Sequence, residues 1–184
     1  MTDKVLPAPA EFDTLPGSKV VLRPFAAADI TDEYVAWLND PEVVKYSNQR
    51  FVRHTLESCR RYCDGFAGTA NLFVSVRSKA DGAAIGTMTA YASPHHQTVD
   101  IGIMIGRRSV WGTGMGQDAW NTLLNWFINE RRVRKATAGT MRCNAAMVKL
   151  MERSGMKLEA IRPQQELLDG IPQDMLYYGK FRDQ

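Results

Sequence analysis

Hydrophobic and polar residues alternate along the middle of the chain. In residues 98–106, TVDIGIMIG, every second residue from Val99 to Ile105 is valine or isoleucine. A period of two is typical of a strand, so these side chains share one face and Asp100, Gly102 and Met104 share the other. Residues 72–77 and 84–93 are also extended, and the turns KADG and PHHQ separate the three segments. The pattern predicts an antiparallel meander.

Apolar residues recur at helical spacing in four other segments, which predicts helices over residues 30–38, 55–66, 115–129 and 144–154. Further strands are predicted over residues 19–25, 135–141, 156–162 and 175–181, with the last two flanking the turn LLDGIPQ. This order predicts a mixed α/β fold, with a mostly antiparallel central sheet flanked by helices. The helix between residues 98–106 and 135–141 requires those two strands to pair in parallel.

Length and charge limit the class of protein. The chain has 184 residues, so we expect one domain over residues 18–184, preceded by a loosely ordered arm, residues 1–17. The 23 basic residues only slightly exceed the 20 acidic ones, which does not favour a nucleic-acid surface. No apolar run approaches the ~20 residues of a membrane span, and no signal-peptide pattern is present. We expect a monomer or homodimer without nucleic-acid or membrane partners.

The cysteines and histidines do not indicate a disulfide or a metal site. Cys59 and Cys63 fall one helical turn apart, where Cβ atoms are farther apart than a disulfide allows. His54, His95 and His96 lack the spacing of zinc ligands. We therefore expect free thiols in a reducing, cytoplasmic setting and no metal cofactor.

Three glycines stand at alternate positions in the turn SVWGTGMGQDAW, residues 109–120, directly before the longest predicted helix. A glycine-rich entry into a helix exposes backbone amides at the positive end of the helix dipole, which suits phosphate oxygens. The spacing G-x-G-x-G matches neither the dinucleotide fingerprint nor the P-loop. A turn that uses glycine only to reverse the chain is the alternative.

The strand and turn together, D-I-G-I-M-I-G followed by W-G-T-G-M-G, resemble the acetyl-coenzyme-A signature of the GNAT superfamily of N-acetyltransferases. A second block, residues 144–156, is similar to the family's N-x-x-S-x-x-x-x-E-K-x-G-F pattern, in the right order and at the right distance. The resemblance covers residues 20–181. Residues 22–24 and 37–51 are similar to two groups, the ribosomal-protein N-terminal acetyltransferases and the amino-sugar N-acetyltransferases of surface-polysaccharide pathways, and the run from Tyr46 to Phe51 favours the second.

The resemblance implies a GNAT-like fold, acetyl-coenzyme A (acetyl-CoA) as co-substrate, and a parallel strand pair that is splayed at the cofactor site. Two positions depart from the family pattern. Trp111 stands where members often have Gln or Arg, and Met151 stands where many have the tyrosine that protonates the departing thiolate. The cofactor contacts that the resemblance implies are Ile103, Met104, Ile105, Arg107, Gly112, Thr113, Gly114, Met115, Gly116 and Asn144.

Acetyl transfer to an amine requires a neutral nitrogen and a stabilised oxyanion. The resemblance implies that a backbone amide near Met104 faces the thioester carbonyl. Asp100 shares that strand face and is the candidate base, although a solvated carboxylate at a strand edge is an equal interpretation. His54 is a second candidate, but a single histidine before a helix is more typical of a structural role.

Trp37, Tyr46, Arg50 and His54 are expected to line the acceptor site. A lysine-like amine is neutral only about once in 2,500 molecules at pH 7, whereas electron-withdrawing oxygens make a sugar amine weakly basic. A chain with few acid–base residues therefore suits a small amine, best a nucleotide-linked amino sugar. The alternatives are protein N-terminal acetylation of the ribosomal-protein type and a non-catalytic acyl-CoA-binding module.

Overall fold

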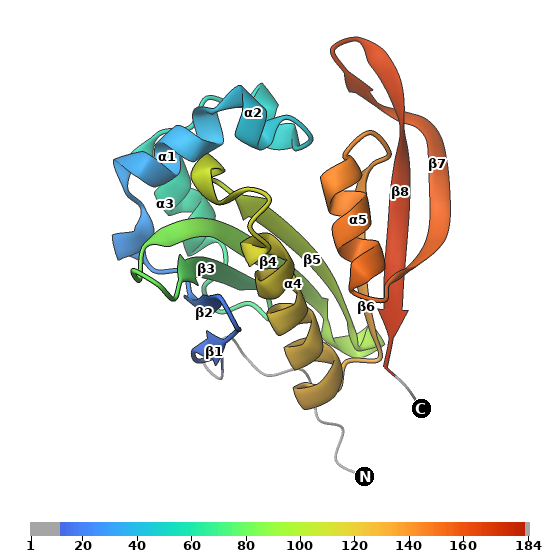
Figure 1. Ribbon diagram of the computed structural model, residues 1–184, viewed down its shortest axis with the longest axis horizontal. Coiled ribbons are helices and arrows are strands. Elements are labelled where there is room, and N and C mark those ends of the chain that lie inside the picture. Colours follow the sequence, from blue (N-terminus) through green and yellow to red (C-terminus); the bar gives the residue numbers. More distant parts are fainter. Residues whose placement is uncertain (1–11, 183–184) are drawn as a thin grey trace.

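One sheet of eight strands runs through the protein, in the order β1-β2-β3-β4-β5-β6-β8-β7 (Figure 1). The computed structural model describes residues 12–182. Within them only β5 and β6 pair in parallel, and the other neighbouring strands are antiparallel. The predicted mixed, mostly antiparallel sheet is confirmed. The strands are β1 (Leu15–Pro16), β2 (Val20–Pro24), β3 (Leu72–Ser78), β4 (Ala84–Ser93), β5 (Thr98–Ile105), β6 (Lys135–Met141), β7 (Lys157–Leu168) and β8 (Ile171–Phe181).

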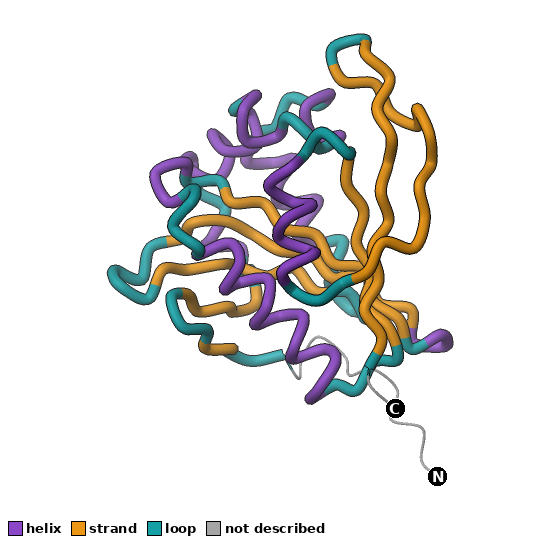
Figure 2. Tube along the Cα trace, turned by 45° about the vertical axis from the view of Figure 1, so that its right-hand side comes forward, coloured by secondary structure: helices purple, strands orange, loops and turns teal. Residues whose placement is uncertain are grey.

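Helices flank both faces of the sheet (Figure 1, Figure 2). One face carries α4 (Met115–Asn125), which continues through a π-helical turn over Trp126–Glu130, and α5 (Ala145–Arg153). The other face carries α1 (Asp32–Asn39) and α3 (Leu56–Asp64), with the short α2 (Pro41–Val44) between them in sequence. Among the described helices, none combines the length and the hydropathy that a bilayer crossing requires.

The sheet separates two apolar cores. The larger core lies under α4 and α5 and includes Val99 and Ile101 of β5, which are 1% and 2% exposed, and Trp120 of α4. The smaller core lies under α1 and α3 and includes Trp37 and Phe73, with Met104 of β5 packed at its margin. The predicted alternation along β5 is therefore confirmed, because neighbouring residues face different cores.

The last two strands are longer than the sequence predicted. Their connection is a two-residue turn in which Asp169 and Gly170 both have positive φ, 51° and 78°. A pair of left-handed residues is the preferred hairpin turn for Asp-Gly, so the expected wider turn over LLDGIPQ is wrong. The exposed edge strand β7 contains Pro163 and two register shifts. Both features oppose pairing with another strand.

Two segments near the N-terminus also depart from the expectation. Residues 1–11 of the expected loose arm lie outside the described residues, but Phe12 is buried against Trp126, with 5.3 Å between ring centroids. Leu15 and Pro16 pair with β2, so residues 12–17 are held to the domain. The first predicted helix, residues 30–38, is followed by a break and then by α2, because the Asp40 carboxylate accepts a hydrogen bond from the Glu42 amide and caps α2.

Asp118 ties the start of the sheet to α4. Its carboxylate accepts backbone hydrogen bonds from Ser18 (3.0 Å), Lys19 (2.7 Å) and Val20 (3.0 Å). A Cβ at Gly17 would lie 2.5 Å from the Asp118 Oδ2 atom, so the turn before β2 needs glycine to approach this closely. Charge-assisted bonds are stronger than neutral ones. Asp118 therefore fixes Lys19 and the beginning of β2 beside the N-terminus of α4.

Replacing Asp118 with Ala should lower the free energy of unfolding by about 2–3 kcal/mol, because three amides lose a charged acceptor. Urea unfolding followed by circular dichroism measures the change. Asp64→Ala is the matched control, since the Asp64 carboxylate at the end of α3 makes no hydrogen bond within residues 12–182, and we expect a change within about 0.5 kcal/mol. Equal losses in the two variants would contradict the anchoring role.

Candidate active site

The parallel strands β5 and β6 pair over a short distance and then separate (Figure 1). The paired positions are Thr98 with Lys135, Val99 with Ala136, and Asp100 with Thr137. Beyond them, β6 continues to pair with β8 through Met141, and β5 continues to pair with β4 through Ile105. The facing edges of β5 and β6 therefore diverge, which leaves backbone donors and acceptors available to a ligand. The predicted parallel pair is confirmed.

The far end of β5 is fastened to the loop that follows it. The Trp111 indole N–H donates to the Ile105 carbonyl oxygen at 2.8 Å. Trp111, which departs from the family's usual Gln or Arg, thus fixes the glycine-rich turn to the strand. Ile103 and Met104 lie between this contact and the paired segment. Their place beside the gap agrees with the predicted role in cofactor binding, which stays a prediction.

The three glycines of the turn are needed for different physical reasons. Gly112 and Gly114 have φ of 75° and 85°, in the left-handed region that favours glycine. Gly116 lies in the first turn of α4, where an added Cβ would be 3.3 Å from the Ile105 side chain. Two glycines therefore turn the chain, and the third allows α4 to pack closely on β5.

The N-terminus of α4 presents free backbone amides. Gly114 is the N-cap residue and has no side chain to accept from them, and the first helical bond runs from the Asp118 amide to the Gly114 oxygen at 3.0 Å. Within the described part of the chain, the amides of residues 115–117 have no acceptor. Such donors at a helix N-terminus suit phosphate oxygens. The Thr113 hydroxyl donates to the Val110 oxygen, and the Met115 side chain packs against the larger core. These two residues would therefore contact a cofactor through their backbone groups.

The cation beside the turn is not the one that the sequence suggested. Arg107 donates to the Glu33 carboxylate at 3.0 Å and lies 4.0 Å from the Asp81 carboxylate, so its guanidinium points toward α1. Lys19 instead donates to the Thr113 oxygen at 2.6 Å, across 94 residues of sequence. Neither motif spacing nor periodicity signals such a contact. Lys19 is thus a cofactor-site candidate that the sequence analysis missed.

Asn144 caps the start of α5. Its Oδ1 atom accepts from the Met147 amide at 3.3 Å, and its Nδ2 atom donates to the Thr140 hydroxyl at 3.1 Å. Its contact with the cofactor stays a prediction. Met151, at the position of the family's tyrosine, is fully buried in the larger core. That position offers no proton donor.

Asp100 lies at the last paired position before the strands separate. Its carboxylate accepts from the Thr137 hydroxyl of β6 at 2.7 Å. Desolvation by surrounding protein raises the pKa of Asp100 above its ordinary value, and the Thr137 hydrogen bond opposes this shift. The residue remains accessible to solvent. A carboxylate with a raised pKa is a better match for a proton-accepting role near neutral pH.

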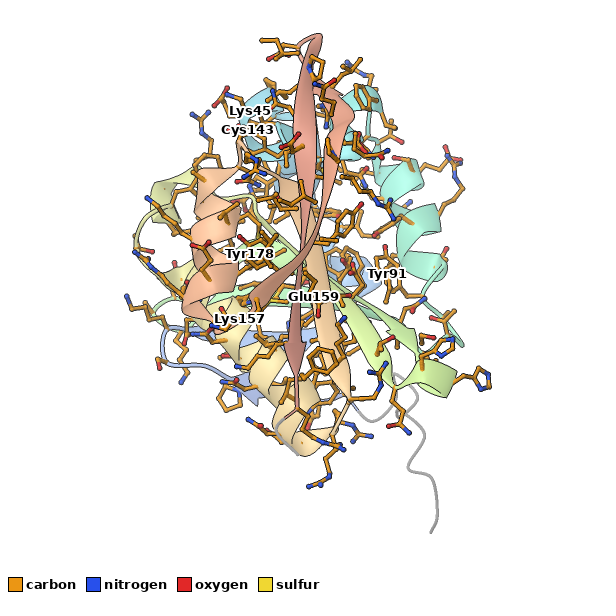
Figure 3. All side chains as sticks on the ribbon, turned by 90° about the vertical axis from the view of Figure 1, so that its right-hand side faces the viewer. Lys45, Tyr91, Cys143, Lys157, Glu159 and Tyr178 are labelled. Atoms are coloured by element: carbon orange, nitrogen blue, oxygen red, sulfur yellow. The ribbon has the colours of Figure 1, made fainter. Side chains whose placement is uncertain are left out.

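A second carboxylate lies beyond Thr137 on the same side of the sheet, and Figure 3 looks onto this side of the molecule. Glu159 of β7 forms an ion pair with Lys135 at 2.6 Å and covers Gly179, the register partner of Thr137. Its charge is therefore compensated. Asp100 forms no ion pair among the described residues, and those residues contain no group of three or more His, Cys, Asp or Glu side chains that could hold a metal.

Aromatic side chains border Asp100 on its other side. Tyr91 of β4 is the cross-strand neighbour of Asp100, and its hydroxyl lies 2.8 Å from the Tyr62 hydroxyl of α3. The Phe66 ring lies 5.9 Å from the Tyr91 ring. Tyr91 and Tyr62 are 44% and 38% exposed, and burial raises the pKa of Tyr62, so its hydroxyl stays protonated. The sequence analysis did not identify this wall, because Tyr62 and Tyr91 meet only in the folded chain.

Two of the four expected acceptor residues offer little to a ligand at the strand gap. Trp37 is 8% exposed, and its ring lies so close to Gly106 that a Cβ there would be 2.1 Å from it. The His54 amide donates to the Asn39 side chain at 2.9 Å, and the His54 Nε2 atom lies 3.3 Å from the Gln49 oxygen. These contacts join His54 to Asn39 and Gln49, and its predicted roles as a base and an acceptor contact stay predictions.

The other two lie between α2 and the tip of the β7–β8 hairpin. Arg50 donates to the Leu167 oxygen of β7 at 2.9 Å and to the Ser47 oxygen at 2.8 Å, so it joins the 3-10 turn at Asn48–Phe51 to the hairpin. Tyr46 is half-buried nearby in sequence. The segment from Tyr46 to Arg50 therefore bridges to β7, and its contact with an acceptor stays a prediction.

Comparisons with known proteins agree with this geometry. Residues 19–157 match the family model described as acetyltransferase (GNAT) domain. A search of curated proteins found no match. Among solved structures, the chain is similar to a GNAT-family acetyltransferase from Bacillus anthracis, with 18% identity, 93% of this chain and 99% of that one covered, and a TM-score of 0.79.

Two further solved structures are similar over nearly the whole chain. One is a ribosomal-protein-S5-alanine acetyltransferase from Vibrio fischeri, with 15% identity, coverage of 92% and 97%, and a TM-score of 0.78. The other is a spermidine N-acetyltransferase from Vibrio cholerae in complex with CoA and spermine, with 17% identity, coverage of 90% and 96%, and a TM-score of 0.79. At these identities the structures support the fold, while the family model spans most of the chain. The chain therefore belongs to the GNAT family and is an acetyl-CoA-dependent N-acetyltransferase.

Proposed function

We propose that the chain transfers the acetyl group of acetyl-CoA to a small, weakly basic amine, with a nucleotide-linked amino sugar as the best-matched class. The observation that carries the proposal is the position of Asp100, an accessible carboxylate with a raised pKa at the point where β5 and β6 separate. The three free cysteines among the described residues fit the cytoplasmic setting that forms part of this proposal.

In this proposal the diphosphate of acetyl-CoA binds at the free amides of residues 115–117, and Lys19 adds a positive charge beside them. The acetyl group enters the gap between β5 and β6, where a backbone amide near Met104 faces its carbonyl oxygen. Asp100 accepts the proton of the attacking amine from the opposite face. A CoA thiol resembles a cysteine thiol with pKa ~8.5, so it leaves as thiolate without a donor at Met151.

Two features favour a small acceptor over an extended peptide. Tyr91 and Tyr62 offer half-exposed rings beside Asp100, and such rings stack well on a sugar or another flat polar body. The contact from Arg50 to Leu167 closes the approach between the 3-10 turn and the hairpin, which limits the room for a chain that continues past the amine. Protein N-terminal acetylation is the outcome that the acceptor test below would detect instead.

An acceptor panel tests the proposal directly. The protein is mixed with acetyl-CoA and, in turn, a nucleotide-linked amino sugar, spermidine and a peptide with a free N-terminal alanine, and thiol release is measured. We expect kcat/KM at least ~10-fold higher for the amino sugar, because its amine is less basic than the amines of spermidine and because the Tyr91 and Tyr62 rings suit a sugar better than a peptide. A higher kcat/KM for the peptide would contradict the amino-sugar proposal and favour a protein N-terminus as the acceptor. Binding of CoA without thiol release for any amine would indicate the non-catalytic module.

Gly114→Val should weaken CoA binding by at least ~10-fold, because a β-branched residue is strained at φ of 85° and its side chain would crowd Lys19 at the phosphate seat. Isothermal titration calorimetry with CoA measures the change. Gly68→Val is the matched control, since Gly68 also has positive φ, 70°, but lies between α3 and β3 in open space. An equal affinity loss in the control would indicate general strain instead of a phosphate seat.

Asp100→Asn should lower kcat/KM by ~10²-fold or more and remove the acidic limb of its pH profile. Asp100 must be ionised to accept a proton, so activity falls as the pH drops through its pKa, which lies above the ordinary aspartate value near ~3.9.

Thr137→Val provides a finer test of the same carboxylate. It removes the hydrogen bond that lowers the pKa of Asp100, so the acidic limb should move to higher pH while activity above the limb is retained. Thr98→Val, two residues before Asp100, is the control and should leave the limb in place. If neither Asp100→Asn nor Thr137→Val changes the pH profile of kcat/KM, Asp100 is excluded as the base.

A further inference from the structure

A second cavity lies on the α1 face of the sheet, away from the gap between β5 and β6. Its volume is about 460 Å³, within the range of small-molecule sites. Strands β2, β3 and β4 form its floor, and α1 with the residues before it forms its wall, whereas no lining residue comes from β6, β7, β8 or α5. The cavity is therefore separate from the acetyl-transfer site.

Two buried hydroxyls form the floor of this cavity. Ser75 of β3 and Thr87 of β4 are cross-strand partners, and they are only 1% and 7% exposed. Neither side chain makes a hydrogen bond to another described residue. Both residues line the cavity, so their hydroxyls are available to a group bound inside it.

Three guanidinium groups surround the same space. Asp29, 9% exposed, accepts from Arg23 at 2.5 Å and from Arg77 at 3.1 Å, and Glu33 accepts from Arg107 at 3.0 Å. Each guanidinium has five N–H donors, so these bonds leave several donors free on each side chain. Arg107 also lies 4.0 Å from the Asp81 carboxylate, which is outside the lining, so three carboxylates balance the three guanidiniums. The free N–H donors, and not a net charge, are the groups that an anionic head would bind.

Aromatic rings also line the cavity. Phe25, Tyr34 and Trp37 all line it, and Phe25 and Tyr34 are in contact with 5.1 Å between their centroids. A ligand that fills this space would place a charged head at the arginines and hydroxyls and an apolar body against the rings. From these contacts we infer that the cavity is a binding site for a small organic anion, with a carboxylate or phosphate head on a flat apolar body, distinct from the acetyl-CoA and acceptor sites.

Titrations with three probes on the full-length protein test this site, in the presence of saturating CoA so that the phosphate seat at α4 is filled. Benzoate carries both head and body, inorganic phosphate carries a head alone, and benzamide carries the body without the charge. Calorimetry should give saturable binding of benzoate at least ~10-fold tighter than that of benzamide, because the charged head is lost. Phosphate binding at the same site would show that the charged head alone is sufficient for binding to the cavity.

Matched variants separate the cavity from other surfaces. Thr87→Val and Ser75→Ala should each weaken benzoate binding about fivefold, since each removes one hydroxyl and no charge. Thr89→Val is the control, because Thr89 is on the same strand and face but does not line the cavity, and it should bind benzoate as the parent does. Melting curves establish that each variant is folded.

Three results would overturn the inference. The first is equal affinity for benzoate and benzamide. The second is benzoate binding that both hydroxyl variants leave unchanged, which would make the interaction an adventitious one elsewhere on the surface. The third is no saturable binding of benzoate or phosphate up to ~10 mM, weaker than the millimolar scale of poor specific ligands. In that case the cavity holds water only.

Discussion

The parallel ladder between β5 and β6 ends at Asp100 and Thr137, and this early end is the constraint on which the site depends. A longer ladder would satisfy the facing backbone groups of both strands and leave nothing for a ligand to bind. β6 separates from β5 because it stays paired with β8 through Met141. The contact between Trp111 and Ile105 then holds the far end of β5 against the glycine-rich turn. One edge of β5 is thus kept open between two fixed ends.

The alternation along β5 couples the hydrophobic core to the chemistry. Val99 and Ile101 are buried under α4, which obliges Asp100 and Met104 to face the opposite side. A register slip of one residue would turn the Asp100 carboxylate into the larger core, where an unpaired charge is very costly. Packing against α4 therefore fixes the direction of the candidate base. The same strand separates α4, whose N-terminal amides are the proposed phosphate site, from the face where an acceptor would bind.

Sequence reasoning succeeded where local patterns decide the outcome and failed where distant residues meet. The period of two in β5 predicted the sheet face, and the glycines before α4 predicted the turn and the start of the helix, because both depend on neighbouring residues. Arg107, a predicted cofactor contact, pairs with Glu33 of α1, whereas Lys19 contacts the glycine-rich turn and has its backbone anchored by Asp118. Such long-range contacts leave no trace in periodicity or spacing.

Two other misses had different causes. The Asp169-Gly170 turn did carry a local signal, since Asp-Gly favours a two-residue hairpin turn, but the surrounding apolar residues were assigned to the loop. The hydrogen bond from the Thr137 hydroxyl to Asp100 had no local signal in the sequence, because the pairing of β5 with β6 brings together two residues that are 37 positions apart.

The buried Met151 changes what the rest of the site must supply. Burial raises the pKa of Tyr178, whose hydroxyl donates to the carboxylate of Glu152 in α5. It is therefore engaged in joining β8 to α5. In the proposed mechanism, the absence of a donor at position 151 means that a thiol with pKa ~8.5 must depart unassisted and that the amine must lose its proton readily. The first demand falls on the leaving group and the second on the nucleophile, and a weakly basic acceptor with Asp100 as the proposed base would meet the second most easily.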